Sequence, residues 1–140
     1  MPTPRLLFVD HVAVLGGGEL SLLDIATHFR SRSRVVLFED GPFRQALETR
    51  NVDTTLLSPA ASIGQVSRHG SFLSALAALP GLVHLVFQLA REARDYDLLY
   101  ANSQKSMVVA ALAGMLARRP VVWHLRDLLL PEHSGWWTRR

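Results

Sequence analysis

The chain has 140 residues, the length of one domain, and its 49% hydrophobic and 19% charged residues are typical of a soluble globular fold. Its net charge of +3 comes without a long basic run, so the sequence does not predict a nucleic-acid partner. It has no cysteine, which excludes disulfides, a thiol nucleophile and a thiolate-bound metal. The N-terminal segment lacks the pattern of a secretory signal, and we expect a cytoplasmic protein.

Short apolar blocks alternate with helical patterns along the chain. The blocks predict strands at Leu6–Asp10, Arg34–Asp40, Val52–Ser58, Asp97–Ala101 and Val121–Leu125. The patterns between them predict helices over Leu20–Phe29, Gly41–Asn51, Ser71 to about Arg94, and Ser106–Arg119. The segment Pro59–Gly70, rich in serine, glycine and proline, is predicted to be a loop.

Strands that alternate with helices favour right-handed crossovers and a parallel sheet. We therefore expect an α/β fold in which residues 1–140 form one Rossmann-like domain. Its doubly wound sheet of about five strands should have the order 3-2-1-4-5 and helices on both faces. No internal repeat or low-complexity segment suggests another architecture.

The segment Ser71–Ala90 runs for twenty residues without a charge, which is long enough to span a bilayer. Pro80 lies in its middle and should break the helix there, giving two short buried helices or one kinked helix packed on the sheet. Because Arg68, Arg91 and Arg94 flank the segment, peripheral contact with a membrane surface is the alternative.

In a doubly wound sheet, ligands bind beyond the carboxyl ends of the strands, near the point where the strand order reverses. This rule brings three segments to one edge: the loop His11–Glu19, the turn Ala101–Lys105 and the strand end Trp123–Asp127. With the order 3-2-1-4-5, the first two segments would form the lips of one crevice.

The glycines Gly16, Gly17 and Gly18 stand before a predicted helix, where backbone N–H groups favour an anion. One interpretation is a dinucleotide fingerprint, which would make the chain an NAD(P)- or FAD-binding domain, but the position of the third glycine holds Ser21. Glu39 or Asp40 could supply the ribose-binding acid of such a fold. A turn without a ligand, in a binding module without catalysis, is the remaining alternative.

Three segments together resemble another family. "LLFVDHVAVLGGGELSLLDIATHF", "GPFRQALETRNVDTTLLSP" and "YDLLYANSQKSMVVAALAGMLARRPVVWHLRD" are similar to the acceptor-side, N-terminal domain of family 4 glycosyltransferases of GT-B fold. The resemblance covers nearly all of the chain up to Asp127. Its most telling parts are the Gly-Gly-x-Glu type of loop and the strand-end histidine, His124.

The resemblance implies a hexosyltransferase that moves a sugar from a nucleotide sugar to a glycan, lipid or small-molecule acceptor, without a metal or another cofactor. It implies that His124 is catalytic. It also implies a group of substrate-binding residues, which are Gly16, Gly17, Gly18, Glu19, Asn102, Ser103, Lys105, Arg126 and Asp127.

These residue types suit the reaction, because negative charge grows on the diphosphate as the sugar leaves, and N–H groups at a helix start can stabilise it. Glu19 would repel a phosphate beside it, so we expect the loop to contact mainly the sugar. Lys105 and Arg126 are available cations. Asp95–Asp97 imitates an Asp-x-Asp metal motif, but it precedes the fourth predicted strand, at the opposite edge.

In the GT-B enzymes that the chain resembles, a second Rossmann-like domain holds most of the donor nucleotide. That donor-binding domain is absent from the 140 residues. We therefore expect the chain alone to show no sugar transfer and to bind nucleotide sugars weakly.

Overall fold

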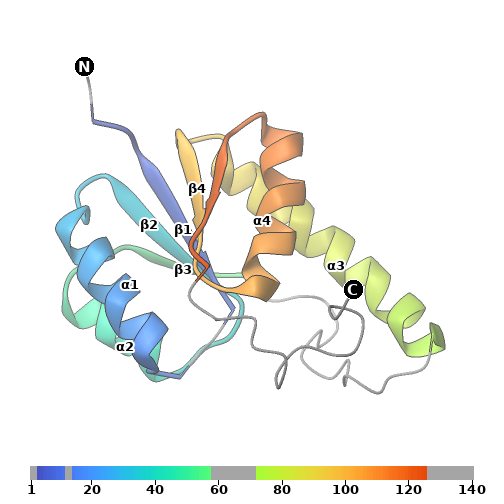
Figure 1. The fold of residues 1–140 in the computed structure, drawn as a ribbon, viewed down its shortest axis with the longest axis horizontal. Helices are drawn as coiled ribbons and strands as arrows, with labels where there is room; N and C mark the ends of the chain where they lie inside the picture. The colour runs from blue at the N-terminus through green and yellow to red at the C-terminus, as the bar shows by residue number, and fades with distance from the viewer. Residues whose placement is uncertain (1–2, 12–13, 58–71, 126–140) are drawn as a thin grey trace.

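Five parallel strands and four helices alternate along the chain in the computed structural model, which describes residues 3–11, 14–57 and 72–125 (Figure 1). The strands are β1 (Leu6–Asp10), β2 (Ser33–Leu37), β3 (Thr54–Leu56), β4 (Leu98–Ala101) and β5 (Val121–Trp123). The helices are α1 (Gly17–His28), α2 (Pro42–Thr49), α3 (Phe72–Ala93) and α4 (Gln104–Ala117).

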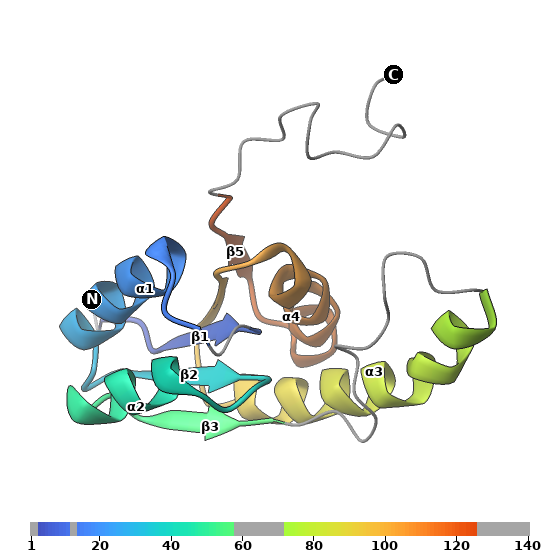
Figure 2. The same ribbon diagram turned by 90° about the horizontal axis from the view of Figure 1, so that it is seen from below.

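The sheet has the order β3-β2-β1-β4-β5, and each pair of neighbours is parallel. Helices α1 and α2 cover one face, and α3 and α4 cover the other (Figures 1 and 2). This arrangement confirms the predicted doubly wound α/β fold and its strand order. The strand order reverses at β1, because the chain adds β2 and β3 on one side of it and β4 and β5 on the other. In such sheets a ligand is expected at the carboxyl end of the strand where the order reverses.

Two apolar layers hold the helices on the sheet. On the α1–α2 side, Phe8 and Phe43 are fully buried. On the α3–α4 side, Leu7, Leu89 and Leu99 are fully buried in a second cluster. Residues of β1 alternate between the two layers, as the period of a strand requires. Burial on both faces explains why β1 reads as a continuous apolar run that ends in Asp10.

Helix α1 begins earlier than the sequence indicates. Gly16 is its N-cap residue, and Gly17 and Gly18 lie in its first turn. None of the described glycines has a φ angle in the left-handed region, so no left-handed turn requires them. A Cβ added to Gly16 would lie 2.7 Å from Glu19 Oε2, so the Glu19 side chain would have to shift away from its contact with Gly16 N.

Helix α3 continues through Pro80, so the expected break into two helices is wrong, and Figure 2 shows one helix that curves over its first turns. Leu76, Leu79 and Pro80 are exposed, so solvent can hydrate the carbonyl group that loses its N–H donor at the proline. No helix in the described part of the chain combines the length and hydropathy needed to cross a bilayer.

The carboxyl-terminal half of α3 packs as the sequence predicts, whereas one stripe of the helix does not. Leu85 and Leu89 are buried in the core beside α4 and the sheet. The exposed apolar side chains recur at helical spacing along another face, and they are Leu76, Leu79, Val83 and Phe87.

Helix α4 starts at Gln104 because Ser103 caps it, with its hydroxyl accepting a hydrogen bond from Ser106 N at 3.2 Å. Near its end, Gly114 gives room for the return into β5. An added Cβ there would lie 2.4 Å from Val121 Cγ2 and 2.9 Å from the backbone oxygen of Arg119. This glycine therefore serves packing rather than ligand binding.

Candidate functional site at the carboxyl edge of the sheet

Three polar residues follow one another across the carboxyl edge of the sheet. Asp10 ends β1, Asn102 follows β4, and His124 follows β5. Asn102 N donates to Val9 O and His124 N donates to Ala101 O, each at 3.0 Å, so the ladder continues past the strand ends. Asp10, Asn102 and His124 therefore form one row, which we call the edge row.

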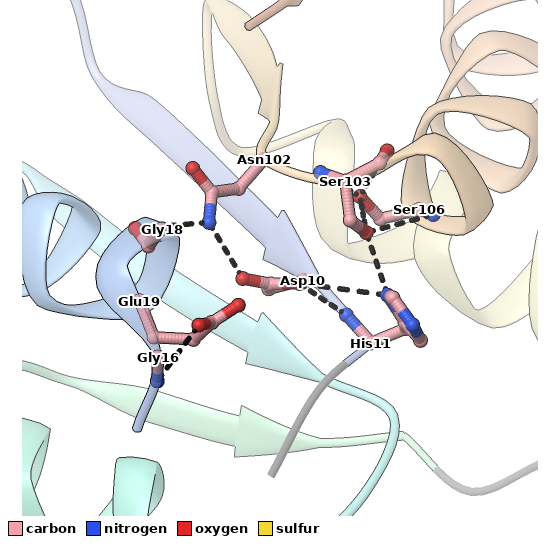
Figure 3. A network of polar contacts seen from close by, with 8 residues as sticks. All are labelled: Asp10, His11, Gly16, Gly18, Glu19, Asn102, Ser103 and Ser106. Atoms are coloured by element: carbon pink, nitrogen blue, oxygen red, sulfur yellow. Dashed lines mark hydrogen bonds and ion pairs between the residues drawn. The ribbon is translucent and has the colours of Figure 1, made fainter. Parts of the chain in front are cut away.

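The edge row lies on the α1 side of the sheet. Phe8 and Tyr100 stand two residues before Asp10 and Asn102, and they pack in the α1–α2 layer. Since successive side chains of a strand point to opposite faces, Asp10 and Asn102 also point toward α1. Figure 3 shows both side chains directed toward Gly18 in the first turn of that helix.

Asp10 is the centre of the polar network in Figure 3. Its carboxylate is fully buried, accepts from Asn102 Nδ2 at 2.7 Å and accepts from His11 N at 2.8 Å. Burial alone would raise the pKa of Asp10, but the contacts with His11 and Asn102 outweigh it and hold this pKa below its ordinary value of 3.8. Asp10 is thus a buried carboxylate anion at neutral pH.

Asn102 connects the network to the glycine segment. Besides its bond to Asp10, its Nδ2 group donates to the carbonyl of Gly18 at 3.4 Å. The side chain therefore links the end of β4 to the first turn of α1. Asn102 is nearly fully buried, so its role here is to hold Asp10 and the first turn of α1 in place.

Glu19 folds back on its own helix. Its Oε2 accepts from Gly16 N at 3.0 Å, as the acidic residue of a capping box does. One N–H group that an anion could have used is therefore already occupied. At Gly17, by contrast, an added Cβ would meet no described atom within 4 Å. Gly17 is exposed, so the described part of the chain leaves space beside it.

His11, directly after β1, reaches the start of α4. Its Nδ1 atom is 2.7 Å from Ser103 Oγ and 3.6 Å from Asp10 Oδ1. Ser103 therefore caps α4 and contacts His11 at the same time. Sequence reasoning missed both Asp10 and His11 as site residues. The signal was present, because a charged residue and a histidine at the end of a fully apolar strand stand at a ligand-binding edge.

His124 is held by an aromatic neighbour. Its Nδ1 atom is hydrogen-bonded to the hydroxyl of Tyr100, and the two rings meet edge to face with centroids 5.9 Å apart. Tyr100 in turn contacts the ring of Phe8 in the core. A side chain anchored in this way keeps a fixed position at the end of the edge row.

The remaining predicted site residues divide into two groups. Lys105 lies in the first turn of α4, at the same edge, and its side chain is exposed. Arg126 and Asp127 lie outside the described residues. The structure thus brings the glycine segment, the turn Asn102–Lys105 and His124 to one edge of the sheet, as the fold predicts.

Asp95–Asp97 lies at the amino edge of the sheet. The carboxylate of Asp97 accepts a hydrogen bond from Arg5 N at 2.8 Å, just before β1 begins. Within residues 3–11, 14–57 and 72–125, no three histidine, aspartate or glutamate side chains are grouped to hold a metal ion.

Comparison with known families finds a match over most of the chain. A family model described as a glycosyl transferase 4-like domain matches residues 16–140. No curated protein matches the chain.

Solved structures extend the comparison. The structure of HepE from Anabaena in complex with UDP and glucose is 38% identical, with a TM-score of 0.77, over 95% of this chain and 33% of that one. HepE in complex with UDP-glucose is also 38% identical, with a TM-score of 0.75. MurG from Acinetobacter baumannii, at 17% identity and a TM-score of 0.57, covers 86% of this chain and 35% of its own, and shows a similar fold. The chain thus spans about a third of the length of these structures.

Proposed function

Because the chain belongs to the family of glycosyl transferase 4-like domains, we propose that it is the N-terminal domain of a GT-B enzyme that transfers a hexose from a UDP-sugar to an acceptor. The choice of donor rests on HepE, whose structure contains UDP-glucose at 38% identity to this chain. The dinucleotide-binding alternative is not favoured, because the family match and the UDP-sugar complexes point to glycosyl transfer.

The observation that carries the proposal is that Gly17 is exposed and no described atom lies where its Cβ would stand, while the next residue, Gly18, contacts Asn102 of the edge row. Backbone without a Cβ lets a sugar ring or a phosphate approach the first turn of α1 closely. The N–H groups of that turn favour a charge-bearing leaving group, because they carry the positive end of the helix dipole. Gly16 N already donates to Glu19 Oε2, so this N–H group is not available to a phosphate. We therefore expect the glycine segment to contact mainly the sugar.

In this proposal each edge residue has one task. Gly16, Gly17 and Gly18 allow close approach, Glu19 fixes the helix start, and Asn102 holds the first turn of α1 at its height above the sheet. Ser103 anchors the turn after β4, and the exposed Lys105 is a cation for the diphosphate. His124 lies at the reacting sugar, with Arg126 and Asp127 following it in the chain. The acceptor is a glycan, a lipid or a small molecule.

Replacing Gly17 with alanine tests the close approach. Since the new Cβ meets no described atom and alanine favours a helix more than glycine does, thermal stability should stay the same or rise slightly. In the full-length enzyme, the KM for UDP-glucose should rise about tenfold, because a methyl group would stand where the sugar lies. Steady-state kinetics and a thermal melt measure the two effects.

His28→Ala is the matched control, because His28 is exposed near the other end of the same helix, far from the proposed ligand. It should change neither quantity. An unchanged KM for UDP-glucose in a stable Gly17→Ala enzyme would contradict the proposed approach.

A second experiment separates this chain from the complete enzyme. The 140 residues alone should transfer no sugar and should bind UDP-glucose weakly, because the proposed site forms one wall of a cleft and cannot exclude water. Isothermal titration with UDP-glucose and with NAD⁺ measures this. Tight binding of NAD⁺ to the chain would instead support the dinucleotide alternative.

The exposed stripe of α3 supports a separate proposal, that this helix lies against an anionic membrane surface. Leu76, Leu79, Val83 and Phe87 share one face, and the exposed Arg91 continues it. Apolar side chains flanked by cations fit the boundary of an anionic bilayer. The charge of Arg94, just beyond the helix, adds to this attraction.

Sedimentation with vesicles tests this contact. The chain should bind vesicles of phosphatidylglycerol and phosphatidylcholine more strongly than vesicles of phosphatidylcholine alone. Phe87→Glu should reduce the binding several-fold, because it places a charge where acyl chains would lie. Gln45→Glu is the control, because Gln45 is exposed on α2, which covers the other face of the sheet. Equal binding by the two variants would contradict the contact.

A further inference from the structure

Residues 14–24, which include the glycine segment, carry two carboxylates and no lysine or arginine. We propose that this part of the site selects an uncharged hexose and rejects a uronic acid, in which a carboxylate replaces the hydroxymethyl group at C6. The inference rests on the proposed function and deepens it, because it defines the class of donor sugar. It follows from the positions of Glu19, Asp10 and Leu20 around Gly17.

Glu19 lies beside the position that we propose for the sugar. Its Oε2 atom accepts from Gly16 N at 3.0 Å, and a Cβ added to Gly16 would lie 2.7 Å from the same atom. The carboxylate therefore lies against the side of Gly16 on which other residues carry a side chain. Because Gly17 follows directly and its own Cβ position is open, a sugar at Gly17 would have this carboxylate as a neighbour.

Asp10 places a second carboxylate close to the same helical turn. Asn102 Nδ2 donates to Asp10 Oδ2 at 2.7 Å and to the carbonyl of Gly18 at 3.4 Å, so one amide group separates Asp10 from the glycine segment (Figure 3). Asp10 is fully buried, and a buried charge is screened by water and salt much less than an exposed one. Both carboxylates would repel a negative charge on the sugar.

Helix α1 offers no lysine or arginine to such a charge, and its basic residue is His28, in the last turn. The exposed Lys105 begins α4, which covers the opposite face of the sheet (Figure 2), and its proposed partner is the diphosphate. A uronic acid at Gly17 would therefore face two carboxylates without a counter-ion from α1.

Leu20 adds an apolar neighbour. It lies one helical turn after Gly17, on the same side of α1, and half of its surface is exposed. Val14 and Leu15, which precede the glycines, are exposed as well. An ionised carboxylate loses hydration beside apolar groups, and without a cation nothing replaces that hydration. A hydroxymethyl group loses far less, so these residues favour the uncharged sugar.

Two matched pairs of donors test the selection in the full-length enzyme. UDP-glucose and UDP-glucuronate differ only at C6, and so do UDP-galactose and UDP-galacturonate. Within the pair that the enzyme uses, we expect kcat/KM for the uncharged sugar to exceed that for the uronic acid by about 10²-fold or more, because the charge of the uronic acid is left unpaired. Steady-state kinetics with each donor and the same acceptor measure this preference.

Glu19→Gln tests the residue that borders the sugar. It removes a charge and keeps a side chain that can cap the helix, because glutamine also serves at this position of a capping box. The preference for the uncharged sugar should fall about tenfold, since one of the two repelling carboxylates is gone. A purely structural role of Glu19 would instead lower kcat/KM for both donors by the same factor. Glu48→Gln is the matched control, because Glu48 is exposed on α2, and it should leave the preference unchanged.

Leu20→Arg tests the selection in the opposite direction. The side chain of Leu20 is exposed, so the fold should tolerate the change, and the new guanidinium group would pair with a sugar carboxylate. The preference for the uncharged sugar should again fall about tenfold. Leu20→Gln, which has a similar length and no charge, is the control and should retain the preference.

The outcomes separate this inference from the proposed function. Comparable kcat/KM values for a uronic acid and its uncharged counterpart in the unmodified enzyme would overturn the inference and leave the proposed function intact. Absence of transfer from any UDP-sugar would overturn the proposed function, and the inference with it. An unchanged preference in folded Glu19→Gln and Leu20→Arg enzymes would overturn the selection by these residues. A lowered preference in both variants, with the two controls unchanged, would support it.

Discussion

Replacing His124 with alanine should lower the turnover number of the proposed full-length glycosyltransferase by about 10²–10⁴, the range of a lost acid–base or electrostatic contact. His124 ends the edge row, and its ring is fixed by the hydroxyl of Tyr100. In the position that we propose for His124, at the reacting sugar, a fixed polar group contributes most in the transition state, so kcat should fall more than KM rises. Steady-state kinetics with UDP-glucose measure both quantities.

Tyr100→Phe refines this test. It removes the hydrogen bond to His124 and keeps the ring that packs on Phe8, so the fold should be preserved. We expect an intermediate loss of kcat, because the imidazole remains but is less well oriented. His28→Ala is the control, since His28 is exposed on α1 away from the edge. Normal turnover in a folded His124→Ala enzyme would reduce His124 to a packing role.

Replacing Asn102 with alanine should lower the free energy of unfolding by about 1–3 kcal/mol at neutral pH, because a buried acceptor loses its donor. Asn102 Nδ2 lies 2.7 Å from Asp10 Oδ2, and both residues are buried. The link to Gly18 is lost as well. Urea unfolding of the 140-residue chain measures the change, with Gln45→Ala on the surface of α2 as control.

The effect should depend on pH in a direction that the pKa of Asp10 sets. Because the folded-state pKa of Asp10 is below 3.8, the carboxylate stabilises the fold above that pH, and this contribution is lost as pH falls through the folded-state pKa. Asn102→Ala should raise that pKa, so its loss of stability should be largest near pH 7 and should shrink below pH 3.8. A deficit that is equal at all pH values would contradict the role of the Asp10 charge.

The fold was accessible from the sequence because its signals are local. Alternating apolar runs and helical patterns predicted all five strands and their order, since the length of each crossover and its right-handed twist leave few alternatives. Two predictions from local residue preference were wrong, and they concern Pro80 in α3 and the start of α1. The break expected at Pro80 is absent because exposed neighbours let water replace the lost hydrogen bond, and α1 begins at Gly17 because Glu19 caps it.

The sequence by itself determined the doubly wound sheet and the placement of the glycine segment, Asn102 and His124 at its carboxyl edge. Only the tertiary structure decided that Asp10 and His11 belong to the same network. Their partners Asn102 and Ser103 lie 92 residues away along the chain, and no local pattern encodes such a contact. Strands β1 and β4 had to pair before the carboxylate, the amide, the imidazole and the hydroxyl could form hydrogen bonds with one another.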